Sequence, residues 1–132
     1  MVVDVTDLDF VARTVMAEAE GEGYEGKVAV AAVIYNRARN PRWWGLTIKD
    51  VCLTSKQFSA WNDDSARRNK IGEWSLEHKV FRDCFRAAID AYDRDPTGGA
   101  DHYFAHGIVH PPWAEGFHVR IIGNHTFLRR YV

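Results

Sequence analysis

The segment that most constrains the fold is the apolar run VAVAAVIY at residues 28–35. It lies within residues 24–39, which have the composition of a helix, and Asn40-Pro41 ends that stretch. A helix that is apolar on every side must be surrounded by other elements. The sequence therefore predicts a domain built around one buried central helix.

A further set of short elements is expected around this helix. A first helix can be capped by Thr6 or Asp7, carries apolar residues at helical spacing, and stops at Gly21 and Gly23. The last third of the chain is aromatic and β-branched, which favours short strands. The remaining elements are a short helix at residues 47–52, a long helix that starts at the capping residue Ser75 and runs to Asp95, and strands near 102–104, 119–122 and 125–128.

These patterns predict one α+β domain, mainly α, over residues 1–132, with a small β element near its C-terminus. The 132 residues are 46% hydrophobic and 27% charged, as in an ordinary soluble globule. A net charge of −1 gives no reason to expect nucleic acid as a partner. The N-terminus MVVDVTDLDF has no signal-peptide pattern and no run could span a membrane. We expect a monomer that is cytoplasmic at synthesis, or a domain of a longer exported protein.

Four carboxylates crowd the glycine-rich stretch AEAEGEGYEG at residues 17–26. Partial burial and like charges favour the protonated form of a carboxyl group, which suits general acid catalysis. At about 100° per residue, Glu18 lies near the apolar side of the first helix and Glu20 on its opposite flank. Glu25 fits the first turn of the next helix, where it favours the helix dipole. Geometry leaves Glu18 and Glu20 as rivals, and four solvated carboxylates as the simpler alternative.

Four blocks of sequence resemble the SleB/CwlJ-type cell wall hydrolases, known from spore-cortex lysis and from phage lysins. The family's E-A-x-G-E is present from Glu18 to Glu22, followed by E-G-x-x-A-V-A-x-V-x-x-N-R from Glu25 to Arg37. The element QFS-x-W-N follows at residues 57–62, and then DPTGGADHYF and IGNHTFLRRY. The resemblance covers residues 8–131 and keeps the four blocks in order.

This resemblance implies a lysozyme-like fold and cleavage of the glycan strand of peptidoglycan. It assigns the catalytic acid to Glu18, makes Glu20 a bystander at a variable position, and gives Glu22 a supporting role. Hydrogen-bonding and aromatic side chains in the matching blocks are candidates for binding the sugars, although core packing, turn or surface roles remain open for several of them. The expected substrate-binding residues are Glu22, Gln57, Ser59, Trp61, Asn62, Tyr103 and His125.

A glycosidase usually has two carboxylates across the scissile bond, and no convincing second one stands out. The acidic residues considered lie in loop contexts: Asp63, Asp64, Asp95, Asp101 and Glu115. One carboxyl group suffices in a lytic transglycosylase, where the C6 hydroxyl of N-acetylmuramic acid attacks its own C1 and gives a 1,6-anhydro product. Hydrolysis as a muramidase, with water held by Gln57, Ser59 or a loop aspartate, is the alternative, and a non-catalytic glycan-binding module is another.

A zinc-dependent amidase or peptidase is the alternative from another enzyme class. His102, His106 and His110 are spaced by four residues, which on a helix would place three imidazoles on one face. The segment contains Gly107 and ends in two prolines, so it favours strand and loop. We therefore expect no metal and no cofactor. For biological role, a phage endolysin and a bacterial wall enzyme both fit.

The two cysteines, Cys52 and Cys84, form no metal-binding pair. Cys84 falls on an apolar helix stripe and is expected to be buried. Two residues so far apart do not decide whether a disulfide forms.

Overall fold

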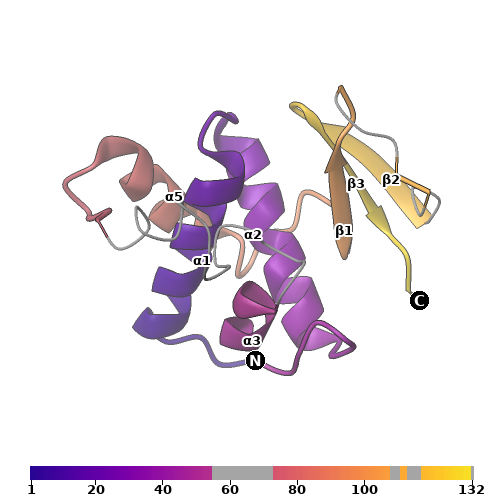
Figure 1. The fold of residues 1–132 in the computed structure, drawn as a ribbon, viewed down its shortest axis with the longest axis horizontal. Coiled ribbons are helices and arrows are strands. Elements are labelled where there is room, and N and C mark those ends of the chain that lie inside the picture. Colours follow the sequence, from indigo (N-terminus) through magenta and orange to yellow (C-terminus); the bar gives the residue numbers. More distant parts are fainter. Residues whose placement is uncertain (55–72, 108–110, 113–116, 132) are drawn as a thin grey trace.

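The computed structural model describes residues 1–54, 73–107, 111–112 and 117–131. The expected fold class is confirmed: helices form most of the domain, and a small antiparallel sheet lies near the C-terminus (Figure 1). The elements are α1 (Val5–Ala19), α2 (Tyr24–Arg39), α3 (Ile48–Leu53), α5 (Lys79–Asp90), β1 (His102–Ala105), β2 (Phe117–Ile122) and β3 (His125–Arg129).

Helix α2 is the centre of the domain, as the apolar run predicts. Every residue from Val28 to Tyr35 is 1% exposed or less. α2 packs against α1, α3 and α5 and also contacts β2, and it separates α1 from the sheet (Figure 1). The small side chains in its middle allow the neighbouring helices to approach closely, so one helix organises the whole core.

Helix α1 begins earlier than the sequence analysis expects. Asp4 is its N-cap, and the Asp4 side chain accepts a hydrogen bond from the backbone N–H of Asp7 at 2.8 Å. The Asp7 carboxylate accepts one from the backbone N–H of Asp4 at 3.1 Å. This reciprocal capping box satisfies two amides at the helix start, so Asp7 acts three residues inside the helix and Thr6 is not the cap.

Helix α5 is shorter at both ends than the predicted helix from Ser75 to Asp95. The backbone turns at Ser75, and His78 caps α5 by accepting a hydrogen bond from the N–H of Phe81 through Nδ1 at 3.3 Å. At the other end Ala91 is the C-cap. Cys84, Ala87 and Ala88 of the predicted apolar stripe are buried, whereas Leu76 lies before the helix and is exposed. The imidazole of His78, and not the hydroxyl of Ser75, is the cap.

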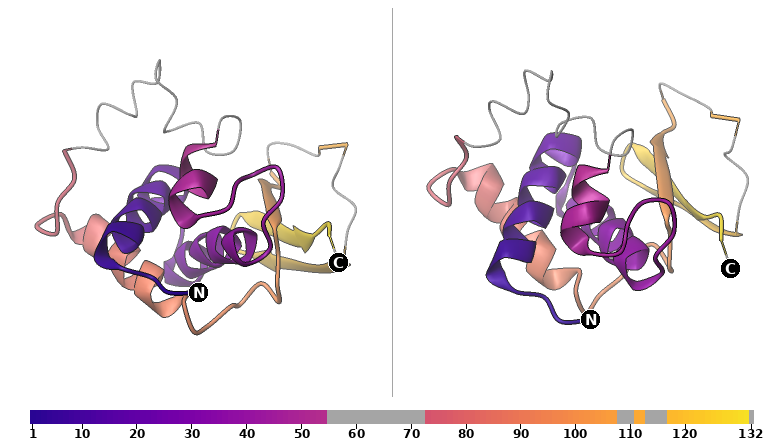
Figure 2. Two further views of the ribbon diagram at one scale, coloured as in Figure 1. Left: turned by 90° about the horizontal axis from the view of Figure 1, so that it is seen from below. Right: turned by 60° about the horizontal axis from the view of Figure 1, so that its bottom comes forward.

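The sheet has the strand order β1-β3-β2, with both pairs antiparallel. Tyr103 of β1 pairs with Phe127 of β3, and Ile122 of β2 pairs with His125. The turn between β2 and β3 contains Gly123 in the left-handed region at φ 58°, which a glycine adopts without strain. The sheet lies beside α2 in all three views (Figures 1 and 2).

Both cysteines are buried as free thiols, Cys52 in α3, which packs against α1 and α2, and Cys84 beside the Met16 sulfur at 3.9 Å. Burial raises the pKa of each thiol to about 12, so neither is a reactive thiolate. In the described part of the chain, no helix combines the length and apolar character that crossing a bilayer requires.

The dependence of the fold on α2 can be tested with two isoleucines. Ile34 is 0% exposed in α2, whereas Ile89 is 53% exposed in α5. We expect Ile34→Ala to lower the free energy of unfolding by about 2–5 kcal/mol, because it removes buried methyl groups and leaves a cavity. Ile89→Ala should lower it by about 1 kcal/mol or less. Urea unfolding measures both, and equal losses would contradict the central role of α2.

Candidate active site

The four glutamates between the last turn of α1 and the first turn of α2 have four different surroundings. Glu18 lies in the last turn of α1 and is half-buried, whereas Glu20 is exposed as the C-cap. The Glu22 side chain is only 7% exposed. Glu25 forms an ion pair with Arg94 at 2.7 Å in the first turn of α2. The cluster is therefore not a set of equivalent solvated carboxylates.

A buried lysine holds the loop between α1 and α2. Lys27 is 6% exposed, and its Nζ donates hydrogen bonds to the backbone carbonyls of Glu20, at 3.0 Å, and of Glu22. The Lys27 ammonium group also lies at the C-terminal end of α1, where a cation interacts favourably with the dipole of that helix. Lys27 was not among the predicted site residues. The signal was a charged residue directly before the apolar run, where burial demands a partner.

The Glu22 carboxylate joins this loop to the β2–β3 turn. Its Oε1 accepts hydrogen bonds from the backbone N–H of Asn124 at 2.9 Å and from His125 Nδ1 at 2.8 Å, and its Oε2 accepts one from the Asn124 side chain at 2.8 Å. Burial alone would raise the pKa of Glu22, but these donors outweigh it and hold the pKa below its ordinary value. Glu22 is therefore an ionised carboxylate that is bound within the protein.

Glu18 lies close to the aromatic side of the sheet. Burial raises the pKa of Tyr103 well above its usual range, and the negative charge of Glu18 adds to this effect. The Tyr103 ring packs perpendicular to the His125 ring, with centroids 5.3 Å apart, and against Phe127 at 5.5 Å. Among the predicted site residues, the structure thus brings together Glu18, Glu22, Tyr103 and His125.

The last turn of α2 ties the helix to the turn that precedes β1. Asn36 Nδ2 donates to the Asp95 carboxylate at 2.9 Å, and Arg37 Nε donates to the backbone carbonyl of Asp101 at 2.7 Å. Arg37 is 6% exposed, and its guanidinium lies 5.1 Å from the Trp44 ring. Burial lowers the pKa of Arg37 to about 10, which leaves it a cation at neutral pH. The family block at residues 25–37 therefore contacts the block DPTGGADHYF here.

Asp95 and Asp101, two of the acidic residues considered for catalysis, are bound by backbone amides. Asp95 accepts hydrogen bonds from the N–H groups of Thr97 and Gly99, each at 2.8 Å. Asp101 accepts one from His102 at 2.8 Å and one from the N–H of Arg130 at 2.8 Å. Burial opposes ionisation of both, but these donors lower the pKa of each carboxyl group. Both have a structural role in these turns.

Several predicted site residues lie outside the described residues. They are the substrate-binding candidates Gln57, Ser59, Trp61 and Asn62, and the acidic residues Asp63, Asp64 and Glu115. Their roles stay predictions.

The histidines considered for zinc do not lie on a helix. His102 is in strand β1, where its Nδ1 bonds to Asp101, and His106 follows the strand and bonds to Thr126 at 3.0 Å. His110 is outside the described residues. Residues 1–54, 73–107, 111–112 and 117–131 contain no group of three His, Cys, Asp or Glu side chains arranged to hold a metal ion.

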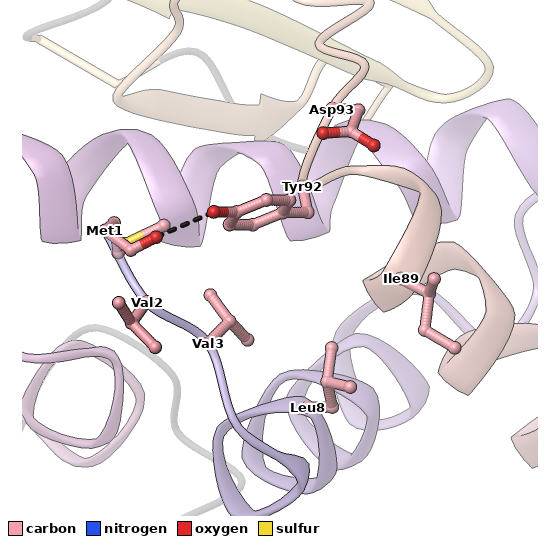
Figure 3. A pocket seen from close by; sticks show the side chains of 7 residues that line it. All are labelled: Met1, Val2, Val3, Leu8, Ile89, Tyr92 and Asp93. Carbon is pink, nitrogen blue, oxygen red and sulfur yellow. Dashed lines mark hydrogen bonds between the residues drawn. The ribbon is translucent and has the colours of Figure 1, made fainter.

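A pocket of about 380 Å³ lies at the opposite end of α1, between the N-terminal segment and the end of α5 (Figure 3). Its walls are mainly apolar, and Tyr92 donates a hydrogen bond to the Met1 carbonyl at 2.7 Å. Asp93 is the one carboxylate among its lining residues. It lies apart from Glu18, since ten residues of helix between Leu8 and Glu18 span about 15 Å.

Two solved structures share this fold. The catalytic domain of the germination-specific lytic transglycosylase SleB from Bacillus anthracis has a TM-score of 0.74 and 29% identity, over 96% of this chain and 97% of that one. The catalytic domain of the Bacillus cereus SleB protein has a TM-score of 0.76 and 28% identity, over 97% and 93%. The domain is therefore of the SleB catalytic type.

Curated sequences agree with the structures. Spore cortex-lytic enzymes from Oceanobacillus iheyensis and Bacillus subtilis are 32% and 31% identical to this chain over 93% and 92% of its length. The chain spans 41% and 37% of those two proteins. The chain belongs to the Cell Wall Hydrolase family, which matches residues 21–128, so the expected resemblance is confirmed.

The bound state of Glu22 predicts a specific pH dependence of stability. Because its folded-state pKa lies below the ordinary value of 4.5, the unfolded chain binds more protons in this range. Stability from Glu22 is therefore present above pH 4.5 and is lost as the pH falls through the lower folded-state pKa. We expect Glu22→Gln to cost about 1–3 kcal/mol at pH 7, and the difference from wild type to shrink as the solution is acidified.

Urea unfolding at several pH values between about 3 and 7 measures this difference. Glu20→Gln is the matched control, since Glu20 is exposed two residues earlier in the same loop. A difference between wild type and Glu22→Gln that stays constant over this range would contradict the prediction.

Proposed function

We propose that this chain is the catalytic domain of a lytic transglycosylase that cleaves peptidoglycan between N-acetylmuramic acid and N-acetylglucosamine. The observation that carries the proposal is the contrast between two glutamates that are four residues apart, one in the last turn of α1 and one in the loop that follows it. Glu18 is half-buried beside Tyr103, whereas both oxygens of Glu22 accept hydrogen bonds within the protein. Carboxyl groups in different environments take different roles, and Glu18 is the one suited to exchange a proton with substrate. The similar SleB catalytic domains support the substrate class.

In the proposed reaction, Glu18 first protonates the glycosidic oxygen, and the bond between that oxygen and C1 of N-acetylmuramic acid breaks. The C6 hydroxyl oxygen of the same sugar then bonds to C1. Its proton passes to the Glu18 carboxylate, which returns to its starting state. No water is consumed, and the product is the 1,6-anhydro sugar. The intramolecular attack gains from proximity, so a second catalytic carboxylate is not required.

Within the described part of the chain, the surroundings of three other candidate carboxylates support a mechanism with one catalytic carboxyl group. Glu22, Asp95 and Asp101 are each bound by backbone or side-chain donors. Using any of them as a nucleophile or base would break those hydrogen bonds, at a cost of about 1.5–3 kcal/mol for each bond to a charged group.

For the physiological substrate we propose peptidoglycan of the spore-cortex type, because the curated relatives are named spore cortex-lytic enzymes. A phage endolysin that acts on the vegetative wall stays a prediction. Digesting purified cortex and vegetative peptidoglycan in parallel separates the two.

We expect Glu18→Gln to retain the fold and to lose peptidoglycan cleavage by a factor of about 100 or more, because the amide cannot transfer the proton. Circular dichroism checks the fold, and mass spectrometry of the released muropeptides gives the reaction type. The wild-type protein should release 1,6-anhydro products with and without EDTA, and Glu20→Gln is the matched control.

Other products would assign another reaction. Reducing-end muramic acid would mean hydrolysis, as in a muramidase. Cleaved amide bonds that require metal would mean a zinc amidase. Binding without cleavage by the wild-type protein would mean a glycan-binding module.

A further inference from the structure

The contact between Glu22 and the β2–β3 turn is more specific than a surface ion pair. In the sequence, Glu22 is 102 residues from Asn124 and 103 residues from His125. Three donor groups of these two residues bond to the Glu22 carboxylate at 2.8–2.9 Å. Both partners are largely buried, with 7% of the Glu22 side chain and 13% of the His125 side chain exposed. Such a contact fixes the position of every group in it.

The glycines around this contact leave little room for another arrangement. A Cβ on Gly123 would lie 2.9 Å from Glu22 Oε1, and a Cβ on Gly26 would lie 2.9 Å from Glu22 Cβ. Both distances are shorter than van der Waals contact. The carboxylate thus occupies a slot between the start of α2 and the turn, and the two glycines provide the space for it.

The contact also determines the tautomer of His125. Glu22 is ionised, so its Oε1 only accepts hydrogen bonds, and His125 Nδ1 must carry a proton to bond to it. In a neutral imidazole the other nitrogen, Nε2, then holds the lone pair. The two ring nitrogens of His125 are therefore not interchangeable: Nδ1 bonds to Glu22, and in the neutral ring Nε2 is the acceptor.

We propose that Glu22 is a positioning residue, which holds the β2–β3 turn against the end of α1 and fixes His125 as the Nδ1–H tautomer, so that Nε2 accepts a hydrogen bond from the sugar. The donor on the substrate would be a hydroxyl or the N–H of an acetamido group. Because the His125 ring packs on Tyr103, and Tyr103 interacts electrostatically with Glu18, this acceptor belongs to the same cluster as the proposed catalytic acid. Glu22 then acts through His125 and not through direct contact with substrate.

The tautomer can be observed directly by two-bond ¹H–¹⁵N correlation of the imidazoles in the whole chain. The chain has six histidines, and the signals missing in His125→Phe identify those of His125. We expect the wild-type protein to show a protonated Nδ1 and a lone pair on Nε2. In Glu22→Ala we expect the Nε2–H form, which predominates for an imidazole without a partner in water. A wild-type spectrum with the proton on Nε2 would overturn the proposal, and it requires no variant to fold.

Activity separates positioning from substrate contact. Glu22→Ala and His125→Phe should each lower the turnover of peptidoglycan by roughly 10- to 100-fold, as expected when the group that orients a site residue is lost. If Glu22 acts through His125, the double variant should be no slower than the slower single variant. Losses that multiply in the double variant would overturn the proposal.

Glu22→Gln is the conservative variant. Its Oε1 can still accept hydrogen bonds from the Asn124 N–H and from His125 Nδ1, and the Asn124 amide can rotate to accept from the new amide group. We expect it to keep the Nδ1–H tautomer and most of the activity, with Glu20→Gln as the control. An inactive Glu22→Gln with the wild-type tautomer would overturn the proposal, because Glu22 would then act independently of His125.

The role of His125 toward sugar rests on the proposed function, but the two fail separately. The tautomer is measured without substrate. If Glu18→Gln still cleaved peptidoglycan, the proposed function would fail while the tautomer result would stand.

Discussion

The structure depends on the complete burial of α2. Eight consecutive residues of this helix have essentially no exposed surface, so every surrounding element must pack against it. Its buried polar groups lie near its two ends. Lys27 in the first turn binds the carbonyls of the loop that follows α1, and Asn36 and Arg37 in the last turns bind the segment before β1. One apolar helix thereby positions both the loop after α1, which contains Glu22, and the segment that leads into β1.

Polar contacts between residues far apart in the chain join the helices to the sheet and the strands to one another. Glu22 connects the end of α1 to the β2–β3 turn, and Asp101 connects the start of β1 to the end of β3. A buried carboxylate is stabilised only where several donors converge on it, so each contact allows one arrangement of the segments that it joins. The blocks of the family pattern that looked separate in the sequence supply the partners of these contacts.

Local patterns were enough to predict α2, the short strands near the C-terminus and the mainly helical class. They failed at the starts of α1 and α5, where Asp4 and His78 are the caps in place of the expected residues, because a cap depends on which acceptor side chain lies within reach of the free amides. Helical-wheel geometry did not decide between Glu18 and Glu20 as the candidate for the catalytic acid. The structure separates their surroundings, half-buried against exposed, because α1 ends at Ala19. The Glu22 contact could not be predicted, since no local pattern links residues more than a hundred positions apart.

The rigid attachment of this loop bears directly on the chemistry. In a glycosidase with two carboxylates, a bound water or a nucleophilic side chain is placed by the protein. With a single catalytic carboxyl group, the nucleophile is part of the substrate, and the enzyme gains rate mainly by holding the sugar so that its C6 hydroxyl faces C1. The sugar must therefore be positioned to within a fraction of an ångström of the reactive geometry. Lys27 and Glu22 fix the loop directly after Glu18, and Tyr103 and His125 are fixed by the sheet beside it. The proposed mechanism requires a stiff scaffold more than a second acid, and in it the Glu22 carboxylate serves to stiffen the loop.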